Sequence, residues 1–387
     1  MPKSIALLGS TGSIGKNTLN VIAAHPEKFQ LSSFAAGKNV ALAVEQALKF
    51  RPRFVSLATK EGAEEARQAL PAEIDVVWGK DGLETVAQDA EADTVVAAVV
   101  GSIGLRATLA AIAAGKTVAL ANKESLVAGG ELVMRAARKK GVPIVPIDSE
   151  HSAIFQCLNG EKRAQVSRLI LTASGGAFRD FDRSELHNVT VEQALAHPNW
   201  AMGQKLTVDS ATMMNKGLEV LEAYWLFDIP FEQIDVVLHR ESIIHSMVEF
   251  VDSSVIAQLG TPDMRIPIQY ALTYPERLPA PYGERLDLAQ MGTLHFIALD
   301  FERYPCVKMA YDAGKAGGTM PAVMNAANEV AVDQFLQGNI PFLGIEQIVA
   351  RVMEAHTPQP VEELEALEEV DARARAAARD IMMNTFA

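Results

Sequence analysis

The N-terminal segment is Ile5-Ala6-Leu7-Leu8-Gly9-Ser10-Thr11-Gly12-Ser13-Ile14-Gly15, an apolar run followed by a glycine-rich turn. Glycines in such a turn let the backbone approach a ligand closely, and the N–H groups that start the next helix can bind a pyrophosphate. The spacing is G-x-x-G-x-x-G and not the more familiar G-x-G-x-x-G, so the turn alone could be only a tight turn. Its position after a first strand favours a dinucleotide site, with cofactor contacts from Ser10, Thr11, Gly12, Ser13 and Ile14.

Residues 1–150 alternate apolar, β-rich runs with segments of helical periodicity. Nearly continuous apolar runs are typical of parallel strands buried on both faces. We therefore expect an α/β domain with a doubly wound, Rossmann-like sheet that binds NADP at the carboxyl ends of its strands. The expected strands are Ile5–Leu8, Leu31–Ala35, Phe54–Ala58, Val76–Trp78, Thr94–Val100, Thr117–Ala121 and Val142–Ile147, with helices that include Leu105–Gly115 and Ser125–Gly141.

The pattern changes after residue 150, which predicts a central α+β catalytic and dimerisation domain over residues 151–285. Its expected elements are a helix at Ser152–Leu158, a strand at Val166–Ala173, a helix at Lys216–Phe227 and a hairpin of Ser242–Val251 with Val255–Leu259. Residues 286–307 are expected to form a linker. Residues 308–387 are rich in Ala, Glu and Arg and predict a C-terminal helical bundle.

Composition excludes several classes of protein. The net charge of −13 argues against nucleic acid as a partner, because phosphate backbones select basic surfaces. We expect no membrane span, because no apolar run reaches the ~18–20 residues that a span needs. Cys157 and Cys306 cannot form a disulfide framework, and the first strand begins too early to follow a signal peptide. These features favour a cytoplasmic protein.

The end of the second expected strand bears on the choice of nicotinamide cofactor. NAD-binding folds usually place an acid there for the ribose 2′-hydroxyl. Here the residues are Gly37-Lys38-Asn39, and a lysine and an amide suit a 2′-phosphate. We therefore predict NADPH over NADH. The alternative is that Lys38 is an ordinary surface lysine and Asn39 caps the next helix.

Three carboxylates indicate a metal site. Asp148 and Glu150 follow an expected strand and would face the same way if that strand continued, while Glu219 lies on an expected helix. Three carboxylates without His or Cys favour Mg²⁺ or Mn²⁺ over zinc. The alternative is that Glu219 and Lys216 form a surface pair. Glu222, one turn further along, is a reserve ligand.

Polar donors for a phosphate occur close to Glu219 in the sequence. Ser174 and Ser210 lie in or beside small-residue turns, and Asn215 and Lys216 begin the expected helix. Hydroxyl, amide and ammonium donors bind a phosphate without making a protein basic, although most turn serines only cap backbone groups. Lys123 follows a strand end, where it can polarise a substrate oxygen or transfer a proton, or can be a surface lysine.

Residues 197–203, His197-Pro198-Asn199-Trp200-Ala201-Met202-Gly203, form a loop that we call the flap. A loop carrying a His, a Trp and a Met could close over a ligand and exclude water. The alternative is a core-packed Trp200 beside a loop His197.

Eight segments occur in a fixed order along the chain: GSTGSIG at 9–15, AGKN at 36–39, ANKES at 121–125, PIDSEH at 146–151, ASGGAF at 173–178, HPNWAMG at 197–203, VDSATMMNKGLE at 208–219 and NAANEVAV at 325–332. In these segments the sequence resembles the 1-deoxy-D-xylulose 5-phosphate reductoisomerase family from end to end. The resemblance implies a homodimer that uses NADPH and one divalent cation. It also implies conversion of that phosphorylated deoxyketose to 2-C-methyl-D-erythritol 4-phosphate, in the non-mevalonate isoprenoid pathway.

The resemblance also implies roles for individual residues. The metal ligands would be Asp148, Glu150 and Glu219. The residues at the substrate would be Ser149, Ser174, His197, Trp200, Ser210, Asn215 and Lys216, and the catalytic ones Lys123, Glu150 and His197. Beyond the glycine-rich turn, the cofactor would contact Gly37, Lys38, Asn39, Asn122, Glu124, Met202 and Gly203.

Two rival functions stay open from the residues alone. An NADP-dependent dehydrogenase of an amino-acid semialdehyde would use the carboxylates to bind substrate, and its activity would survive EDTA. A redox-sensing NADPH-binding module would turn over no phosphosugar.

Overall fold

The computed structural model describes residues 2–386 apart from residues 100, 102 and 201. The chain divides into two compact units. The first comprises Met1–Ser125, Val133–Ser152 and Asp263–Glu284, and the second comprises Leu126–Leu132, Ala153–Pro262 and Arg285–Ala387. The division into four segments expected from the sequence stays a prediction. The two compact units are defined by contacts within the chain, whereas the four segments were defined by their expected functions. Among the described residues, no helix combines the length and the apolar character needed to cross a membrane.

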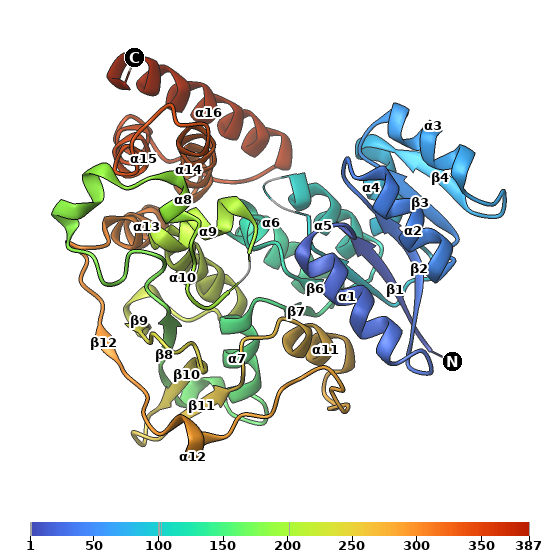
Figure 1. Cartoon of the computed structure of the whole chain (residues 1–387), viewed down its shortest axis with the longest axis horizontal. Coiled ribbons are helices and arrows are strands. Elements are labelled where there is room, and N and C mark those ends of the chain that lie inside the picture. The colour runs from blue at the N-terminus through green and yellow to red at the C-terminus, as the bar shows by residue number, and fades with distance from the viewer. Residues whose placement is uncertain (1, 100, 102, 201, 387) are drawn as a thin grey trace. The chain divides into compact units, whose positions relative to one another are not determined.

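The first unit is built on a seven-stranded sheet with the order β4-β3-β2-β1-β5-β6-β7 (Figure 1). All its neighbouring strands are parallel. The strand order reverses beside β1, so the ligand crevice of such a sheet lies at the carboxyl ends of β1 and β5. The predicted doubly wound α/β fold is confirmed. The strands are β1 (Lys3–Leu8), β2 (Phe29–Ala35), β3 (Phe54–Leu57), β4 (Asp75–Trp78), β5 (Thr94–Ala97), β6 (Thr117–Leu120) and β7 (Ile144–Pro146).

Helices connect these strands, and side-chain caps set several of their starts. Thr59 accepts a hydrogen bond from the Gly62 N–H at 3.1 Å and caps α3. The helices are α1 (Ser13–Ala24), α2 (Val40–Phe50), α3 (Lys60–Ala69), α4 (Gly79–Ala87), α5 (Ile103–Ala113), α6 (Lys123–Lys140), α7 (Ser149–Cys157) and the later α11 (Arg265–Thr273). Helix α11 lies beside α1, where Gln269 and His25 are hydrogen-bonded at 3.0 Å.

Several expected strands are longer than the observed ones, and two differ most. The run at Thr94–Val100 forms a strand only as far as Ala97, and Val100 lies outside the described residues. The run at Val142–Ile147 forms only the short β7, and the strand does not continue through Asp148 and Glu150. The Asp148 carbonyl accepts the Ser152 N–H at 2.8 Å, so the chain turns directly into α7.

The second unit contains a five-stranded sheet with the order β11-β10-β8-β9-β12. Strands β10 and β11 pair antiparallel, which confirms the predicted hairpin, while β8 and β9 are parallel. One face of the sheet, which includes Leu169 and Val248, is buried. Half-buried or exposed residues line the other side, which we call the open face (Ile170, Val237, Met247, Val255 and Ala257). The strands are β8 (Val166–Ala173), β9 (Ile234–Leu238), β10 (Ile244–Phe250), β11 (Val255–Leu259) and β12 (Ile297–Ala298).

Helices of the second unit bury the closed side of this sheet. Side chains such as Leu169 of β8, Leu218 of α10 and Ile348 of α15 belong to one continuous hydrophobic core. The predicted C-terminal helices are present (Figure 1). Their buried side chains belong to the same hydrophobic core as those of the sheet. The α-helices are α8 (Val191–Ala194), α9 (Gln204–Ala211), α10 (Met214–Phe227), α12 (Leu288–Met291), α13 (Pro305–Ala316), α14 (Met320–Leu336), α15 (Gly344–Glu354) and α16 (Leu364–Phe386), with 3₁₀ turns at Arg163–Gln165, Arg183–Asn188 and Phe231–Gln233.

Candidate functional site

The glycine-rich turn between β1 and α1 has the geometry of an anion cradle. Gly9 has φ +93°, and a Cβ at this position would lie 2.5 Å from the Ala98 carbonyl oxygen. A Cβ at Gly15 would lie 2.2 Å from the Gly9 carbonyl oxygen. Helix α1 begins after Gly12 without a side-chain cap, and the buried Ser10 hydroxyl has no hydrogen-bond partner among the described residues. Uncapped N–H groups and an unsatisfied hydroxyl fit a bound pyrophosphate.

The segment after β2 is exposed, which leaves it accessible to a ligand. Gly37, Lys38 and Asn39 are all exposed, and β2 is the neighbour of β1. Asn39 Oδ1 accepts the Leu42 N–H at 3.1 Å, so Asn39 does cap α2, as the alternative interpretation predicted. The cap uses Oδ1 only and is therefore compatible with a contact to a phosphate through Nδ2.

Asn122 connects the ends of β5 and β6. Its Oδ1 accepts the Ser125 N–H at 2.9 Å and caps α6, and its Nδ2 donates to the Gly101 carbonyl at 3.0 Å. Glu124 Oε2 also lies 3.3 Å from this amide. Asn122 and Glu124 are buried. The amide of Asn122 thus holds the loop that follows β5 against the start of α6, at the carboxyl edge of the sheet.

Lys123 and Asp148 form an ion pair at the same edge of the sheet. They follow the adjacent strands β6 and β7, so the strand order itself brings them together. Lys123 is only 6% exposed, so the alternative of a surface lysine is wrong. Ser149 Oγ donates to Glu150 Oε2 at 2.6 Å in the first turn of α7, where the helix dipole favours negative charge. The first unit therefore concentrates Lys123, Asp148, Ser149 and Glu150.

In the second unit, the loop after β8 approaches the end of α9 closely. Gly175 and Gly176 have φ angles of +83° and +70°, which favour glycine. A Cβ at Gly176 would lie 2.3 Å from the Ser210 carbonyl oxygen. The two predicted phosphate-binding turns, at Ser174 and at Ser210, are therefore neighbours.

Helix α10 starts from a strained residue and brings three predicted site residues together. Met213, just before the helix, has φ +62°, a conformation that bulky side chains rarely adopt. Glu219 accepts hydrogen bonds from the Asn215 amide and from the Lys216 ammonium group. Lys216 and Glu219 are 4% and 1% exposed, so the alternative of a surface pair is wrong. Buried charges are uncommon in proteins and often occur at functional sites.

His197 organises the start of the flap. Its Nδ1 accepts the backbone N–H groups of Asn199 at 3.2 Å and Trp200 at 2.9 Å. Its Nε2 lies 3.0 Å from Ser174 Oγ. Burial and the nearby Arg179 lower the pKa of His197 to about 4, so the ring is neutral near pH 7. Because Nδ1 is the acceptor, Nε2 carries the proton and donates to Ser174.

The rest of the flap continues into α9. The half-buried Trp200 ring lies 6.2 Å from the His245 ring of β10, measured between centroids, at an angle of 53°. Met202 is half-buried, and Gly203 is the N-cap residue of α9. Ala201 lies outside the described residues. The flap residues therefore lie between β10 and the start of α9.

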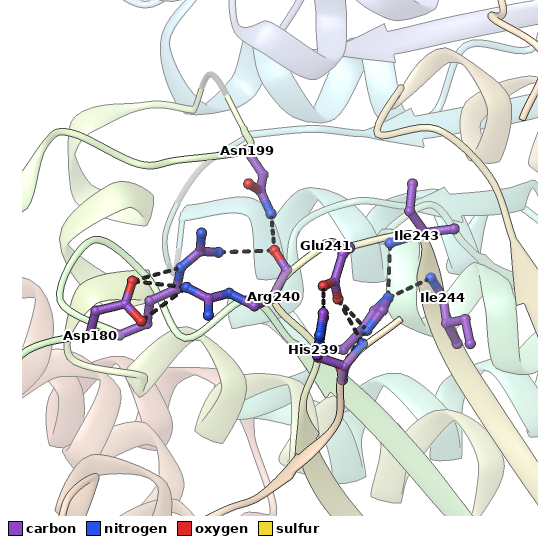
Figure 2. Close-up of polar contacts among 9 residues, drawn as sticks. Asp180, Asn199, His239, Arg240, Glu241, Ile243 and Ile244 are labelled. Carbon is purple, nitrogen blue, oxygen red and sulfur yellow. Dashed lines mark hydrogen bonds and ion pairs between the residues drawn. The ribbon is translucent and has the colours of Figure 1, made fainter. Parts of the chain in front are cut away.

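Figure 2 shows a polar cluster that the sequence did not single out. The Asn199 amide donates to the Arg240 carbonyl, and the Arg240 guanidinium group binds both carboxylate oxygens of Asp180 at 3.0 Å. Asn199 falls within the predicted flap, but no spacing rule connects it with Arg240. The structure is needed to find the contact.

Comparison with known proteins identifies the family. Three family models match the chain: 1-deoxy-D-xylulose 5-phosphate reductoisomerase over residues 5–130, its C-terminal domain over 144–227, and DXP reductoisomerase C-terminal domain over 259–377. The chain belongs to the 1-deoxy-D-xylulose 5-phosphate reductoisomerase family. The resemblance inferred from the eight segments is thereby confirmed.

Individual relatives cover almost the whole chain. Proteins named 1-deoxy-D-xylulose 5-phosphate reductoisomerase from Geobacillus sp. (strain WCH70) and Shouchella clausii (strain KSM-K16) are 58% and 60% identical to it. These matches cover 98% and 96% of this chain and 100% and 98% of the relatives.

Solved structures are similar over the same length. The enzyme from Zymomonas mobilis in complex with NADPH has 43% identity and a TM-score of 0.93, over 99% of both chains. A DOX-P reductoisomerase in complex with NADPH, fosmidomycin and magnesium has 40% identity and a TM-score of 0.92, over 98% of both chains. The predicted fold class agrees with these structures.

Proposed function

We propose that the protein is an enzyme that converts 1-deoxy-D-xylulose 5-phosphate to 2-C-methyl-D-erythritol 4-phosphate with NADPH and a divalent cation, in non-mevalonate isoprenoid biosynthesis. The observation that carries this conclusion is the 58–60% identity to reductoisomerases over nearly the full length of the chain. Neither the semialdehyde dehydrogenase nor the redox-sensing module accounts for that similarity. NADPH and magnesium occur in the solved relatives.

The proposed cofactor site uses the glycine-rich turn for the pyrophosphate. The uncapped start of α1 and the unsatisfied Ser10 hydroxyl support this assignment. Lys38 and Asn39 are proposed to contact the 2′-phosphate, since no acid occupies the end of β2. NADPH, when bound, supplies the hydride that reduces the rearranged aldehyde. The remaining proposed contacts are Thr11, Gly12, Ser13, Ile14, Gly37, Asn122, Glu124, Met202 and Gly203.

The proposed metal ligands are Asp148, Glu150 and Glu219. Three carboxylate oxygens suit a hard cation such as Mg²⁺ or Mn²⁺. When bound, the ion supplies Lewis-acid polarisation of the substrate oxygens. The ion pairs that Asp148 and Glu219 form with lysines support the proposal, because they show that each carboxylate already binds a cationic group.

We propose that Ser174, Ser210, Asn215 and Lys216 bind the substrate phosphate. The close approach of Gly176 to Ser210 supports this assignment, since it brings two of the donor turns together. The phosphate lies at the far end of the substrate from the reacting carbons, so its binding free energy can orient the substrate and close the flap. Ser149 and Trp200 are the other proposed substrate contacts.

Lys123, Glu150 and His197 are the proposed catalytic residues. Lys123 is a buried cation at the carboxyl edge of the sheet, placed to polarise a substrate oxygen or to transfer a proton. His197 is neutral at pH 7 with the proton on Nε2, so its role is to donate a hydrogen bond and not to carry positive charge. Glu150 is both a proposed metal ligand and a proposed catalytic residue.

The decisive experiment follows the oxidation of NADPH with 1-deoxy-D-xylulose 5-phosphate, with and without EDTA. We expect EDTA to abolish turnover and Mg²⁺ or Mn²⁺ to restore it. Asp148→Asn and Glu219→Gln should each abolish turnover and leave NADPH affinity nearly unchanged. Glu232→Gln, at an exposed carboxylate of the second unit, is the control. Undiminished turnover of either site variant would contradict the proposed metal ligands, and turnover that survives EDTA would contradict the metal requirement.

The proposal includes a homodimer that forms through the open face of the five-stranded sheet. The half-buried and exposed apolar side chains of that face support it. We also propose a cytoplasmic location. Free, buried thiols at Cys157 and Cys306 are compatible with a reducing compartment.

A further inference from the structure

The short connection between β9 and β10 contacts the flap directly. We call residues 240–242 the β9–β10 turn. Asn199 Nδ2 donates to the Arg240 carbonyl oxygen at 2.7 Å (Figure 2). It also lies 2.8 Å from Ser242 Oγ. An amide nitrogen has two hydrogens, so both are used in this contact. Asn199 is half-buried and Ser242 is buried, which limits competition from water.

The β9–β10 turn is held in place without help from the flap. His239 Nε2 accepts the N–H groups of Ile243 at 3.2 Å and Ile244 at 3.1 Å (Figure 2). Its Nδ1 therefore carries the proton and donates to the His295 carbonyl at 2.9 Å. His239 is fully buried, and Ser242 has φ +56°. These contacts hold the backbone of the β9–β10 turn in one conformation, so the turn can serve as a docking site for the flap.

The same carbonyl oxygen also accepts a hydrogen bond from the segment that follows Ser174–Gly176. These three residues form the turn proposed to bind the phosphate, which we call the phosphate loop. Arg179 Nη1 donates to the Arg240 carbonyl at 2.9 Å, and Arg179 lies only three residues after Gly176. The neighbouring Asp180 binds the Arg240 guanidinium group through both carboxylate oxygens at 3.0 Å. One carbonyl thus accepts hydrogen bonds from the flap and from the segment that follows the phosphate loop.

We propose that Asn199 is a positioning residue whose amide latches the flap onto the β9–β10 turn, with the Arg240 carbonyl as the acceptor shared with the phosphate loop. Asn199 acts through its neighbours, because the latch fixes the backbone between His197 and Trp200. The proposal rests on the reductoisomerase activity proposed above. It explains how a phosphate held near Ser174 can be sensed by the flap: Arg179, three residues after Gly176, and Asn199 of the flap donate to the same Arg240 carbonyl.

The test compares Asn199→Ala and Asn199→Leu with the wild type. Leu has a similar branched shape but no hydrogen-bond donor. The control is Asn188→Ala, at an exposed asparagine of the same unit. We expect both Asn199 variants to raise the KM for 1-deoxy-D-xylulose 5-phosphate about tenfold, from the loss of two hydrogen bonds. The KM for NADPH should change less than the KM for the substrate, because most of the proposed NADPH contacts lie outside the flap. The melting temperature should stay unchanged, and the control should match the wild type.

Amide hydrogen exchange provides a measurement that does not depend on turnover. Exchange in residues 197–203 of the free enzyme should be faster in Asn199→Ala than in the wild type, while residues 239–244 keep their protection. Ser242→Ala removes one acceptor and leaves the flap sequence intact. It should raise the KM by a smaller factor, and adding it to Asn199→Ala should raise the KM no further, since the two residues share one contact.

Two results would overturn the latch. One is a wild-type KM together with wild-type flap exchange in Asn199→Ala. The other is independent, multiplying effects of Asn199→Ala and Ser242→Ala. A wild-type enzyme that fails to oxidise NADPH with the substrate would instead refute the proposed function, and the exchange measurement would still decide the latch.

Discussion

Both ring nitrogens of His197 have assigned roles in the structure. Nδ1 accepts two backbone N–H groups of the flap, and Nε2 donates to Ser174. A protonated ring would carry hydrogen on Nδ1 and could no longer accept. The conformation of the flap therefore depends on a neutral His197, which follows from the lowered pKa of about 4.

We predict a loss of stability and of substrate affinity in acid that depends on His197. The imidazole pKa is near 6.5 in the unfolded chain and about 4 in the folded one. As the pH falls below 6.5, the unfolded state therefore binds the proton first and the folded state loses stability until the pH reaches about 4. Urea unfolding and the KM for substrate, measured across this window, should show the loss in the wild type.

His197→Gln should weaken this pH dependence, because its side chain does not titrate. The exposed His187 of the same unit offers the matched control, His187→Gln, which should behave as the wild type. If the free energy of unfolding depends on pH equally in His197→Gln and in the wild type, then His197 is not the cause of the loss of stability in acid.

Site residues could be predicted from the sequence where local rules place them. Lys123 and Asp148 follow adjacent parallel strands, and the ends of such strands meet at one edge of the sheet. Asn215 and Glu219 are four residues apart on a helix, so they share a face. Asn199 and Arg240 are 41 positions apart, in two irregular loops. No periodicity relates such loops, so the latch could not be predicted.

At the level of the element, α10 has two roles on opposite sides. Asn215, Lys216 and Glu219 form the polar contact already described, while Gly217 faces α13. A Cβ at Gly217 would lie 2.6 Å from the Ala310 Cβ and 3.2 Å from the Cys306 carbonyl oxygen. The glycine therefore sets the distance between α10 and α13, and it thereby helps to fix the position of Glu219.

We predict that Gly217→Ala destabilises the protein by about 1–3 kcal/mol, the usual result of overpacking a core. The better helix propensity of alanine offsets at most ~1 kcal/mol of this loss. Adding Ala310→Gly should recover part of the loss, because it removes the opposing methyl group. Urea unfolding of both single variants and the double variant measures the coupling. Strictly additive changes would show that the two helices do not meet as described.

The boundary of strand β7 shows where periodicity is a weak guide. The apolar run Val142–Ile147 predicted a strand as far as Ile147, whereas β7 is only Ile144–Pro146 and α7 begins at Ser149. Apolar runs show that a segment is buried, whereas the Asp148 backbone bond to Ser152 decides where the helix starts. Glu150 therefore lies in the first turn of a helix, where its charge is favoured by the helix dipole.

At the scale of the whole molecule, the C-terminal helices are part of a larger core. The sequence predicted a helical bundle there, and amphipathic periodicity shows which face of each helix is apolar but not what covers that face. Val370 and Ala374 of α16 belong to the same hydrophobic cluster as Leu169 of β8. The helical segment and the sheet of the second unit therefore depend on each other for stability.

The open face of the five-stranded sheet supports the last prediction, which concerns assembly. Met247 lies in β10 and pairs with Ile170 on one side and Ala257 on the other. All three side chains are half-buried, and the neighbouring Val255 is 48% exposed. Apolar side chains grouped on one face favour burial against a second copy of the chain.

Met247→Lys should therefore shift the protein from dimer to monomer, because a lysine between Ile170 and Ala257 adds a charge that is costly to bury. Sedimentation velocity at several protein concentrations measures the shift. Leu48→Lys, at an exposed leucine of the first unit that is 42% accessible, is the control and should leave the dimer intact. A wild type that sediments as a monomer would contradict the proposed dimer. A dimeric Met247→Lys would instead place the interface on another surface, since a lysine at the centre of the open face leaves the rest of the molecule unchanged.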